Sequence, residues 1–539
     1  MNVFSQAPGI QWQNTIGGNT TDLLWSIKQA TDGGYILSGS SPSSISGDKT
    51  ENSNGESDCW IIKLDSIGNI IWQNTIGGSG KENVLFGMQQ TYDGGYILGF
   101  YSQSNISGDK SENNLDTVCM PDCTYDYWLV KTDASGNIQW QNTIGGDNDD
   151  ELYSLQQTVD GGFILGGSSK SDLSGDKTEN NWDTTNLTND YWMIKTDSLG
   201  NIQWQNTIGG NGFDWLYTIK QTTDGGYILG GRSGSLVSGD KTVASNGNDD
   251  HWIVKTDASG NIQWQKAIGG GENEDIRSIQ LTADGGYILG GSSRSNISGD
   301  KTENNWDPSL VSHDYWVVKI DFAGNVQWDK TIGGNDFDVL YSIHNTADGG
   351  FILGGVSYSS ISGDKTEVNW DTLFNTSDYW IVKIDSVGNI LWQKSFGGTD
   401  TDVLTCMQRT ADDGYILGGY SESNISGDKS EGSHGYSDYW IIKLLPDTIT
   451  TSAKNPDKLF ANAIQISPNP ATSELRIKNS KFRIEKIEIV DTYGKCLYNS
   501  VFQIQESALN IDVSFLSAGI YFVRILTAGG ISAAKFVKE

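Results

Sequence analysis

Short stretches of alternating apolar and polar residues recur along most of this chain, and they predict β-strands. In residues 149–208 four such stretches follow one another, at 151–158, 163–169, 190–196 and 202–208. The turn sequences D-G-G and D-x-x-G-N join the first pair and the second pair, because Gly or Asn supplies the positive φ that tight hairpins need. No segment has a sustained helical period. The pattern predicts a four-stranded antiparallel meander with a long polar loop between its second and third strands.

The same unit returns along the chain, and one tryptophan marks each copy. Successive tryptophans lie 60–68 residues apart, each in a version of N-I-x-W-Q-N-T-I-G-G. A four-stranded unit at this period predicts a β-propeller blade, whereas a β-solenoid, the alternative, would have shorter coils. The series is Trp12, Trp72, Trp140, Trp204, Trp264, Trp328 and Trp392.

The two ends of the repeat array complement each other. The seventh copy stops after its third strand, before Leu445 and Pro446, and the chain begins with a spare fourth strand at residues 9–16. The simplest explanation is a ring whose last blade is completed by the N-terminal strand, which leaves no open sheet edge. We therefore expect an all-β fold in which residues 1–445 form a seven-bladed β-propeller closed by an N-terminal strand.

This strand order places the first strand of every copy along a central channel. A small residue recurs at one position of that strand, and crowding near the axis is a sufficient steric reason for it. The series is Ser26, Gly87, Ser154, Thr218, Ser278, Ser342 and Thr405.

The chain is strongly acidic, with a formal net charge of −31 over 539 residues. Nucleic acids and anionic membranes attract Lys and Arg, so we expect neither as a partner. No run approaches the roughly 18 apolar residues of a transmembrane helix. The charge predicts a self-repelling extracellular surface or, as the alternative, a surface that collects cations.

Five cysteines are too few for a disulfide scaffold at this length. Cys119 and Cys123, in C-M-P-D-C, would close a small disulfide loop in an oxidising compartment. A zinc site has little support, since no second Cys/His pair lies nearby.

Every long loop carries the sequence S-G-D-K on one face of the predicted ring. Carboxylates and Asn carbonyls gathered there are the hard oxygen ligands that Ca²⁺ prefers. The alternative is that each Asp caps its own turn and that the adjacent Lys offsets its charge. The carboxylates are Asp48, Asp109, Asp176, Asp240, Asp300, Asp364 and Asp428.

Three of these loops add a tryptophan beside an amide, in E-N-N-W-D or E-V-N-W-D. Trp182, Trp306 and Trp370 are expected to stack on a sugar ring, with Asn181 and Asn369 binding hydroxyl groups. Alternatively, each Trp plugs its own loop, as Leu115 in the equivalent place of the second copy suggests.

A catalytic site usually appears as a departure of one copy from the repeated sequence, because a reaction needs a single arrangement of residues and the repeat provides seven equivalent ones. None of the four histidines lies beside an unusual Ser or Cys in the sequence, and no carboxylate pair stands out for glycoside hydrolysis. The sequence therefore predicts no catalytic residue.

The units D-G-G-Y-I-L-G-G, D-Y-W-I-V-K-T-D and G-N-I-Q-W-Q resemble repeats of secreted Bacteroidetes proteins and the delta-60 type of propeller repeat. They are also similar to pyrroloquinoline-quinone-type repeats, in which an Asp, a turn Gly and a Trp dock neighbouring blades. Asp133, Gly136 and Trp140 match that motif, with the first gap one residue short. The resemblance implies that the seven tryptophans dock blades, and it does not imply the quinone cofactor.

After Leu445 the repeat ends, and a polar linker at 446–462 leads to a tail at 463–539. Its alternating strands predict a small β-sandwich. I-S-P-N-P, Y-G-K, I-D-V-S-F-L-S-A-G-I-Y-F-V-R-I and the final K-F-V-K resemble the type A sorting domain of the type IX secretion system. The resemblance implies that secretion machinery is a partner. The matching residues include Pro468, Asn469, Pro470, Gly494, Asp512, Gly519, Tyr521 and Lys535.

The first ten residues have no basic region followed by an apolar one, which by itself predicts retention in the cytoplasm. The sorting resemblance is the more specific signal, so we expect a secreted or cell-surface protein. The sequence predicts a binding or adhesion propeller for an extracellular glycan or protein, with Ca²⁺ as the one ion considered. The alternative is a glycan-active hydrolase that uses the same acidic loop face.

Overall fold

The computed structural model describes residues 7–83, 87–116, 124–183, 185, 187–307, 311–371, 376–447, 464–479, 484–490, 496–504, 508–527 and 530–539. The chain divides into an N-terminal unit, Met1–Asp447, and a C-terminal unit, Thr448–Glu539. Cys119, Cys123, Gly494 and most of the predicted linker lie outside the described residues, so the disulfide stays a prediction. In the described ranges no helix is long and apolar enough to cross a membrane.

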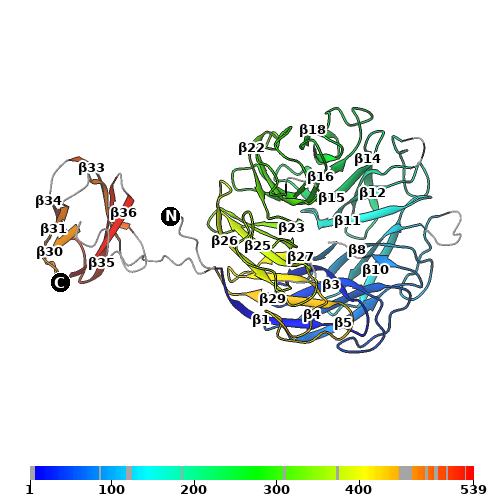
Figure 1. Ribbon diagram of the computed structural model, residues 1–539, viewed down its shortest axis with the longest axis horizontal. Coiled ribbons are helices and arrows are strands. Elements are labelled where there is room, and N and C mark those ends of the chain that lie inside the picture. The colour runs from blue at the N-terminus through cyan, green and yellow to red at the C-terminus, as the bar shows by residue number, and fades with distance from the viewer. Residues whose placement is uncertain are drawn as a thin grey trace. The chain divides into compact units, whose positions relative to one another are not determined.

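Seven antiparallel sheets of consecutive strands make up the described part of the N-terminal unit (Figure 1). The first strands of neighbouring sheets pack against one another at the centre, as β15 does with β11 and β19. The predicted all-β propeller of four-stranded units is confirmed. The first four sheets, from the centre outwards, are β2 (Leu23–Gln29), β3 (Tyr35–Ser41), β4 (Asp58–Leu64), β5 (Ile70–Ile76); β6 (Glu82–Asn83) with β7 (Met88–Gln90), β8 (Tyr96–Ser102), β9 (Asp126–Thr132), β10 (Ile138–Ile144); β11 (Asp150–Gln157), β12 (Phe163–Ser169), β13 (Asp190–Thr196), β14 (Ile202–Ile208); and β15 (Asp214–Gln221), β16 (Tyr227–Ser233), β17 (Asp250–Thr256), β18 (Ile262–Ile268).

The remaining three sheets complete the ring, and the last of them takes its outer strand from the start of the chain. β1 pairs antiparallel with β29, with Ile16 opposite Tyr439 and Ile10 opposite Leu444. β2 of the first sheet packs against β27 and β28 of the last sheet. The predicted closure is therefore confirmed. These sheets are β19 (Glu274–Leu281), β20 (Tyr287–Ser293), β21 (Asp314–Ile320), β22 (Val326–Ile332); β23 (Asp338–Asn345), β24 (Phe351–Ser357), β25 (Asp378–Ile384), β26 (Ile390–Phe396); and β27 (Asp402–Arg409), β28 (Tyr415–Ser421), β29 (Asp438–Leu444), β1 (Ile10–Ile16).

Each outer-strand tryptophan docks against the next sheet. The ring of Trp72 on β5 lies 5.9 Å from that of Tyr96 on β8. A Cβ atom on Gly136 would come within 2.7 Å of the same indole, and the φ of Gly136 is +85°. Asn74 donates its amide to the Gly136 carbonyl at 2.8 Å. A turn glycine is therefore required for close approach, and the predicted docking role is confirmed. The other pairs are Trp12–Tyr35, Trp140–Phe163, Trp204–Tyr227, Trp264–Tyr287, Trp328–Phe351 and Trp392–Tyr415.

The C-terminal unit contains two sheets that share one apolar core. Leu475 and Ile477 from the first sheet and Ile487, Val523 and Phe536 from the second belong to the same buried cluster. The first sheet is β30 (Ile464–Ser467), β31 (Glu474–Asn479) and β34 (Ala508–Asp512); the second is β33 (Cys496–Ile504), β32 (Ile484–Val490), β35 (Gly519–Thr527) and β36 (Gly530–Lys538).

The docking of β1 generates a first prediction. Trp12→Ala should lower the free energy of unfolding by about 2–4 kcal/mol, because it leaves a cavity between the last sheet and the first. Gln11→Ala, on the exposed side of the same strand, should change it by less than about 0.5 kcal/mol. Chemical denaturation followed by tryptophan fluorescence measures both. Equal effects would contradict a closing role for the tryptophan.

Candidate functional site at the channel mouth

The Asp of each S-G-D-K loop binds the backbone of the neighbouring sheet. The Asp48 amide donates to the carbonyl of Gly17, which follows β1, and the Asp48 carboxylate accepts from the Gly17 amide at 3.2 Å. The same amide-to-carbonyl bond recurs in all seven loops. The contact supports the capping alternative, with the difference that the capped turn follows the outer strand of the preceding sheet. The matching pairs are Asp109–Gly77, Asp176–Gly145, Asp240–Gly209, Asp300–Gly269, Asp364–Gly333 and Asp428–Gly397.

The sixth residue after each of these Asp residues reaches the S-G-D-K loop of the next sheet, and we call it the clasp residue. The Trp182 indole N–H donates to the Asp240 carboxylate at 2.7 Å. The clasp contacts therefore run from loop to loop around this face of the ring. The others are Asn54 to Asp109, Leu115 against Gly175, Asn246 to Asp300, Trp306 to Asp364, Trp370 to Asp428 and His434 to Asp48.

The clasp tryptophans lie over the neighbouring loop and do not plug their own. A Cβ atom on Gly239 would come within 2.7 Å of the Trp182 indole, and Gly363 and Gly427 stand in the same relation to Trp306 and Trp370. This corrects the plug interpretation. Each of the three side chains remains about half exposed, at 49–50%. Sugar stacking on their free faces stays a prediction.

Asn181 and Asn369 are directed into their own loops. Asn181 donates its amide to the Ser169 carbonyl at 2.8 Å, and Asn369 donates to the Ser357 carbonyl at 2.8 Å. Both side chains are buried. In this arrangement the two amides hold the loop to its sheet, and a ligand on the surface does not reach them.

The Lys of S-G-D-K turns away from the adjacent Asp and into the blade. The Lys110 ammonium lies 5.2 Å from the ring centroid of the buried Trp128, and it also donates to the Thr143 hydroxyl. Burial lowers the pKa of Lys110 to about 8. The adjacent lysine is therefore a core residue, which corrects the idea that it offsets the charge of its neighbour. Equivalent contacts join Lys49–Trp60, Lys177–Trp192, Lys301–Trp316 and Lys365–Trp380.

Two buried acids flank each junction between sheets. At one junction Asp126 accepts the amide of Leu115, and Asp150 accepts the amide of Gly146 at 2.7 Å. Burial raises the pKa of Asp126 to about 8, and the charge of Asp150 adds to the effect. Burial likewise raises the pKa of Asp150 to about 7. Within the described ranges no group of three or more His, Cys, Asp or Glu is placed to hold a metal ion. Calcium binding stays a prediction.

The inner strands bring a different set of residues together. Each of six inner strands has a one-residue bulge just before its small residue, and the bulged residue carries a large or polar side chain. In the last sheet Cys406 holds the small position, opposite Gly418, and Thr405 is the bulged residue, which corrects the predicted series. The bulged residues are Trp25, Tyr153, Tyr217, Arg277, Tyr341 and Thr405.

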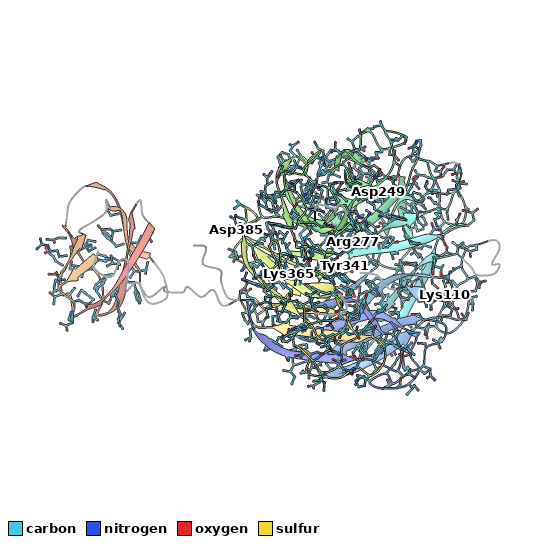
Figure 2. All side chains as sticks on the ribbon, in the orientation of Figure 1. Lys110, Asp249, Arg277, Tyr341, Lys365 and Asp385 are labelled. Atoms are coloured by element: carbon cyan, nitrogen blue, oxygen red, sulfur yellow. The ribbon has the colours of Figure 1, made fainter. Side chains whose placement is uncertain are left out.

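We call the place where these bulged residues lie the channel mouth. Four of them form a chain of contacts, from Tyr153 through Tyr217 and Arg277 to Tyr341. The Arg277 guanidinium lies 4.7 Å from the ring centroid of Tyr217 and 5.9 Å from that of Tyr341, and it pairs with Asp275 at 2.6 Å. The Tyr217 ring lies 5.3 Å from that of Tyr153. Figure 2 shows Arg277 and Tyr341 near the middle of the ring of sheets.

The residues next to the channel mouth also differ from copy to copy. Arg232 lies 4.0 Å over the Trp215 ring and 3.8 Å from the Asp249 carboxylate. Arg294 donates to the His313 imidazole at 2.9 Å. Aromatic and charged groups thus gather beside the bulged residues in some copies and not in others. The contacts at the junctions between sheets, in contrast, recur from copy to copy.

Sequence reasoning missed the channel mouth because it noticed the small residue and gave it a steric role only. The signal lay one position earlier, where five copies carry Trp, Tyr or Arg between constant neighbours. A regular strand would direct such a residue to the face opposite that of its two neighbours. Only the bulge turns it into the channel.

One serine–histidine contact also escaped sequence reasoning. His344 Nε2 lies 3.1 Å from Ser342 Oγ on the inner strand β23. Ser342 is one of the small residues that recur on the inner strands, so the expectation that no histidine lies beside an unusual Ser or Cys is not contradicted. Burial lowers the pKa of His344 to about 3, and nearby Lys28 and Lys220 contribute. Such an imidazole is a weak general base at neutral pH, because efficient bases have pKa values near the working pH.

The sorting residues predicted in the tail gather at two places in the C-terminal unit. Asn469, between exposed Pro468 and Pro470, donates to the Lys535 carbonyl at 3.2 Å and accepts from the Val537 amide at 2.9 Å. Elsewhere in the unit, the Tyr521 hydroxyl donates to the Ser517 carbonyl, two residues before Gly519, and Asp512 accepts the Ser514 amide.

Comparison with protein families identifies this tail. Residues 465–539 match the model of a secretion system C-terminal sorting domain. The predicted sorting domain is therefore confirmed. It points to handling by the type IX secretion system and to a secreted or cell-surface location.

The propeller has more distant relatives. The regulatory protein FlaEY of Caulobacter vibrioides is 27% identical over 248 residues, which make up 46% of this chain and 25% of FlaEY. The chain thus spans about a quarter of that relative. Solved structures with similarity include the Pan2 WD40 domain of Neurospora crassa (9% identity, TM-score 0.39, 82% of this chain and 96% of that one) and puromycin hydrolase (11%, 0.42, 88% and 62%). Membership of a particular propeller repeat family stays a prediction.

The clasp generates a second prediction. Trp182→Phe keeps an aromatic ring but removes the N–H, so it should lower the free energy of unfolding by about 0.5–1.5 kcal/mol. In an Asp240→Ala background the same substitution should cost less, because the acceptor is gone. Urea denaturation of the four proteins measures this coupling. Equal costs in both backgrounds would show that the bond contributes nothing.

The buried acids generate a third prediction, on pH. An acid whose pKa is higher in the folded than in the unfolded state binds a proton that the unfolded chain releases above about pH 4. Stability should therefore fall as the pH rises from about 4 to about 8. Differential scanning calorimetry should give a higher Tm at pH 5 than at pH 8, and Asp126→Asn should reduce the difference. A higher Tm at pH 8 would contradict the assignment.

Proposed function

We propose that this protein is a secreted or cell-surface binding module that holds a carbohydrate ligand at its channel mouth. The observation that carries the proposal is the placement of Trp25, Tyr153, Tyr217, Arg277 and Tyr341 on inner-strand bulges. The copies differ there, whereas the residue before the bulge is Leu or Ile and the residue after it is Ser or Thr in all five of these copies.

The chemistry of the channel mouth suits a polar ligand with an apolar face. Tyrosine and tryptophan rings stack on the C–H faces of sugars, while Arg, carboxylates and phenol groups bind hydroxyls. Arg277 is held by Asp275 and lies against two tyrosine rings, so its direction is fixed before a ligand arrives. Such pre-organisation lowers the entropy cost of binding.

A catalytic role has less support than a binding role. The Ser342–His344 contact offers a nucleophile and a base, but the lowered pKa of His344 weakens the base. The glycan-active hydrolase considered from the sequence therefore remains the second candidate. Release of products distinguishes it from a binding module.

Variants of the channel mouth test the proposal. The full-length protein is applied to a glycan array, together with Tyr217→Ala, Tyr341→Ala and a control, Tyr436→Ala, whose side chain is 78% exposed in a loop. Loss of a stacking residue should weaken binding roughly tenfold or more, as alanine substitution of buried aromatic contacts does. The control should bind as the unchanged protein does.

Two further arms separate the alternatives. Trp182→Ala should leave binding unchanged if the ligand lies at the channel mouth. Loss of binding in this variant would instead place the ligand at the clasp tryptophans. New reducing ends from any bound polysaccharide would replace the binding proposal with hydrolysis. Absence of binding to every glycan on the array would reject a carbohydrate ligand.

A further inference from the structure

The inner strands line a cavity of about 610 Å³ that begins at the channel mouth, where Tyr217, Arg277 and Tyr341 belong to its lining. Its described lining residues include Lys28, Lys220, Arg277 and His344 and contain no Asp or Glu. The whole chain carries 67 acidic residues against 36 Lys and Arg. A channel without carboxylates is therefore a strong local departure from the charge of the protein.

One position of each inner strand supplies a ring of polar side chains to this cavity. Gln occupies it in four sheets, Lys in two and His in one, and the seven residues all line the cavity. The ring is Lys28, Gln89, Gln156, Lys220, Gln280, His344 and Gln408.

The two lysines of the ring differ from those that serve the fold. Lysines such as Lys63 and Lys255 pair with a turn carboxylate at 2.8–2.9 Å. Among the described residues, neither Lys28 nor Lys220 has an ion pair or a hydrogen bond from its ammonium group. Charge without a partner in a confined space is unfavourable, unless a ligand supplies the opposite charge.

Other charged groups near the channel do not act as counter-ions for these lysines. Arg277 above is paired with Asp275, and Asp413 at the lower opening is paired with Arg409. Cys406 lies beside Lys28, but burial raises the pKa of its thiol to about 12, so it is uncharged at neutral pH.

Lys28, Lys220 and His344 line one cavity, and the charges of the two lysines affect the other groups. Burial lowers the pKa of Lys220 to about 8, and Lys28 contributes to this shift. Both lysines also contribute to the lowered pKa of His344. The imidazole of His344 already contacts the Ser342 hydroxyl and the Met407 backbone, so the two ammonium groups are the donors that the ring can offer to a single ligand.

We propose that the channel binds an oxyanion, a carboxylate, sulfate or phosphate group, between Lys28 and Lys220. The inference goes beyond the proposed carbohydrate site and stands independently of it, because it uses different residues. The oxyanion is either a free ion or the acidic group of a larger molecule that enters through the channel mouth.

The ring itself provides the matched substitution. Lys28→Gln and Lys220→Gln introduce the residue that four sheets already carry at this position, so the fold should accept them. Lys81→Gln is the control. It removes an exposed lysine that pairs with Glu56 and does not belong to the cavity lining. Isothermal titration calorimetry of the full-length proteins with sulfate and with phosphate, in chloride-free buffer at pH 7, measures the affinity.

Each channel variant should lose roughly tenfold or more in affinity, as expected for a charge-assisted hydrogen bond. The control should bind as the unchanged protein does. Without added anion, the two channel variants should also melt at a higher temperature than the unchanged protein, because an unpaired charge has been removed. Unchanged affinity in both channel variants, or a lower Tm of both, would overturn the proposal.

A second set of titrations distinguishes a free ion from the acidic group of a larger molecule. A uronate-bearing oligosaccharide that binds while inorganic ions do not, and that loses affinity in Lys220→Gln, identifies the acidic group of a larger ligand. Inorganic sulfate or phosphate binding alone identifies a free ion. Affinity should fall between pH 7 and pH 9, because Lys220 loses its proton there. Failure of every anion to bind would overturn the proposal and leave the channel-mouth proposal unaffected.

Discussion

Closure of the ring is the constraint on which the rest of this structure depends. Seven sheets share one circle, so a side chain that touches a neighbouring sheet must suit the same junction each time it is repeated. The S-G-D-K carboxylates, the Gly-Gly backbone and the outer-strand tryptophans all lie at such junctions. Positions that face the channel or the open face of the loops are free of this requirement. The inner-strand bulges and the clasp residue are two places where the copies differ, and we seek ligand recognition there.

The sequence was sufficient for the fold because its signals are local and repeated. Turn glycines, alternating strands and the spare strand around Trp12 each depend on a few neighbouring residues. Because the unit occurs seven times, a departure in one copy does not obscure the pattern. The clasp was only half visible: Trp182 was conspicuous, but its partner Asp240 lies 58 residues away in another loop. The channel mouth was invisible for a different reason. A bulge shifts the strand pattern by one residue, and nothing in the sequence around Tyr217 or Arg277 shows that shift.

Two sets of lysines in this acidic protein are directed towards its interior. Acidic residues dominate the composition, whereas the lysines of the S-G-D-K loops lie over buried tryptophans and those of the polar ring face the channel. Net charge therefore describes how the protein behaves toward distant molecules and not what its channel attracts. An anion that reaches Lys28 or Lys220 must first cross a repulsive field, and dissolved salt weakens that field more than it weakens contacts inside the channel.

The pairing of β1 with β29 also has a consequence in time. The side chain of Gln13 and the backbone of Asp428, which meet at this seam, are 415 residues apart in the sequence. Contacts of such long range form late in folding, because every intervening sheet must first be in place. Until then the growing arc has two unpaired ends, each with backbone groups ready to join another strand. Pairing of β1 with β29 thus decides when these two ends stop being available to strands of other copies of the chain.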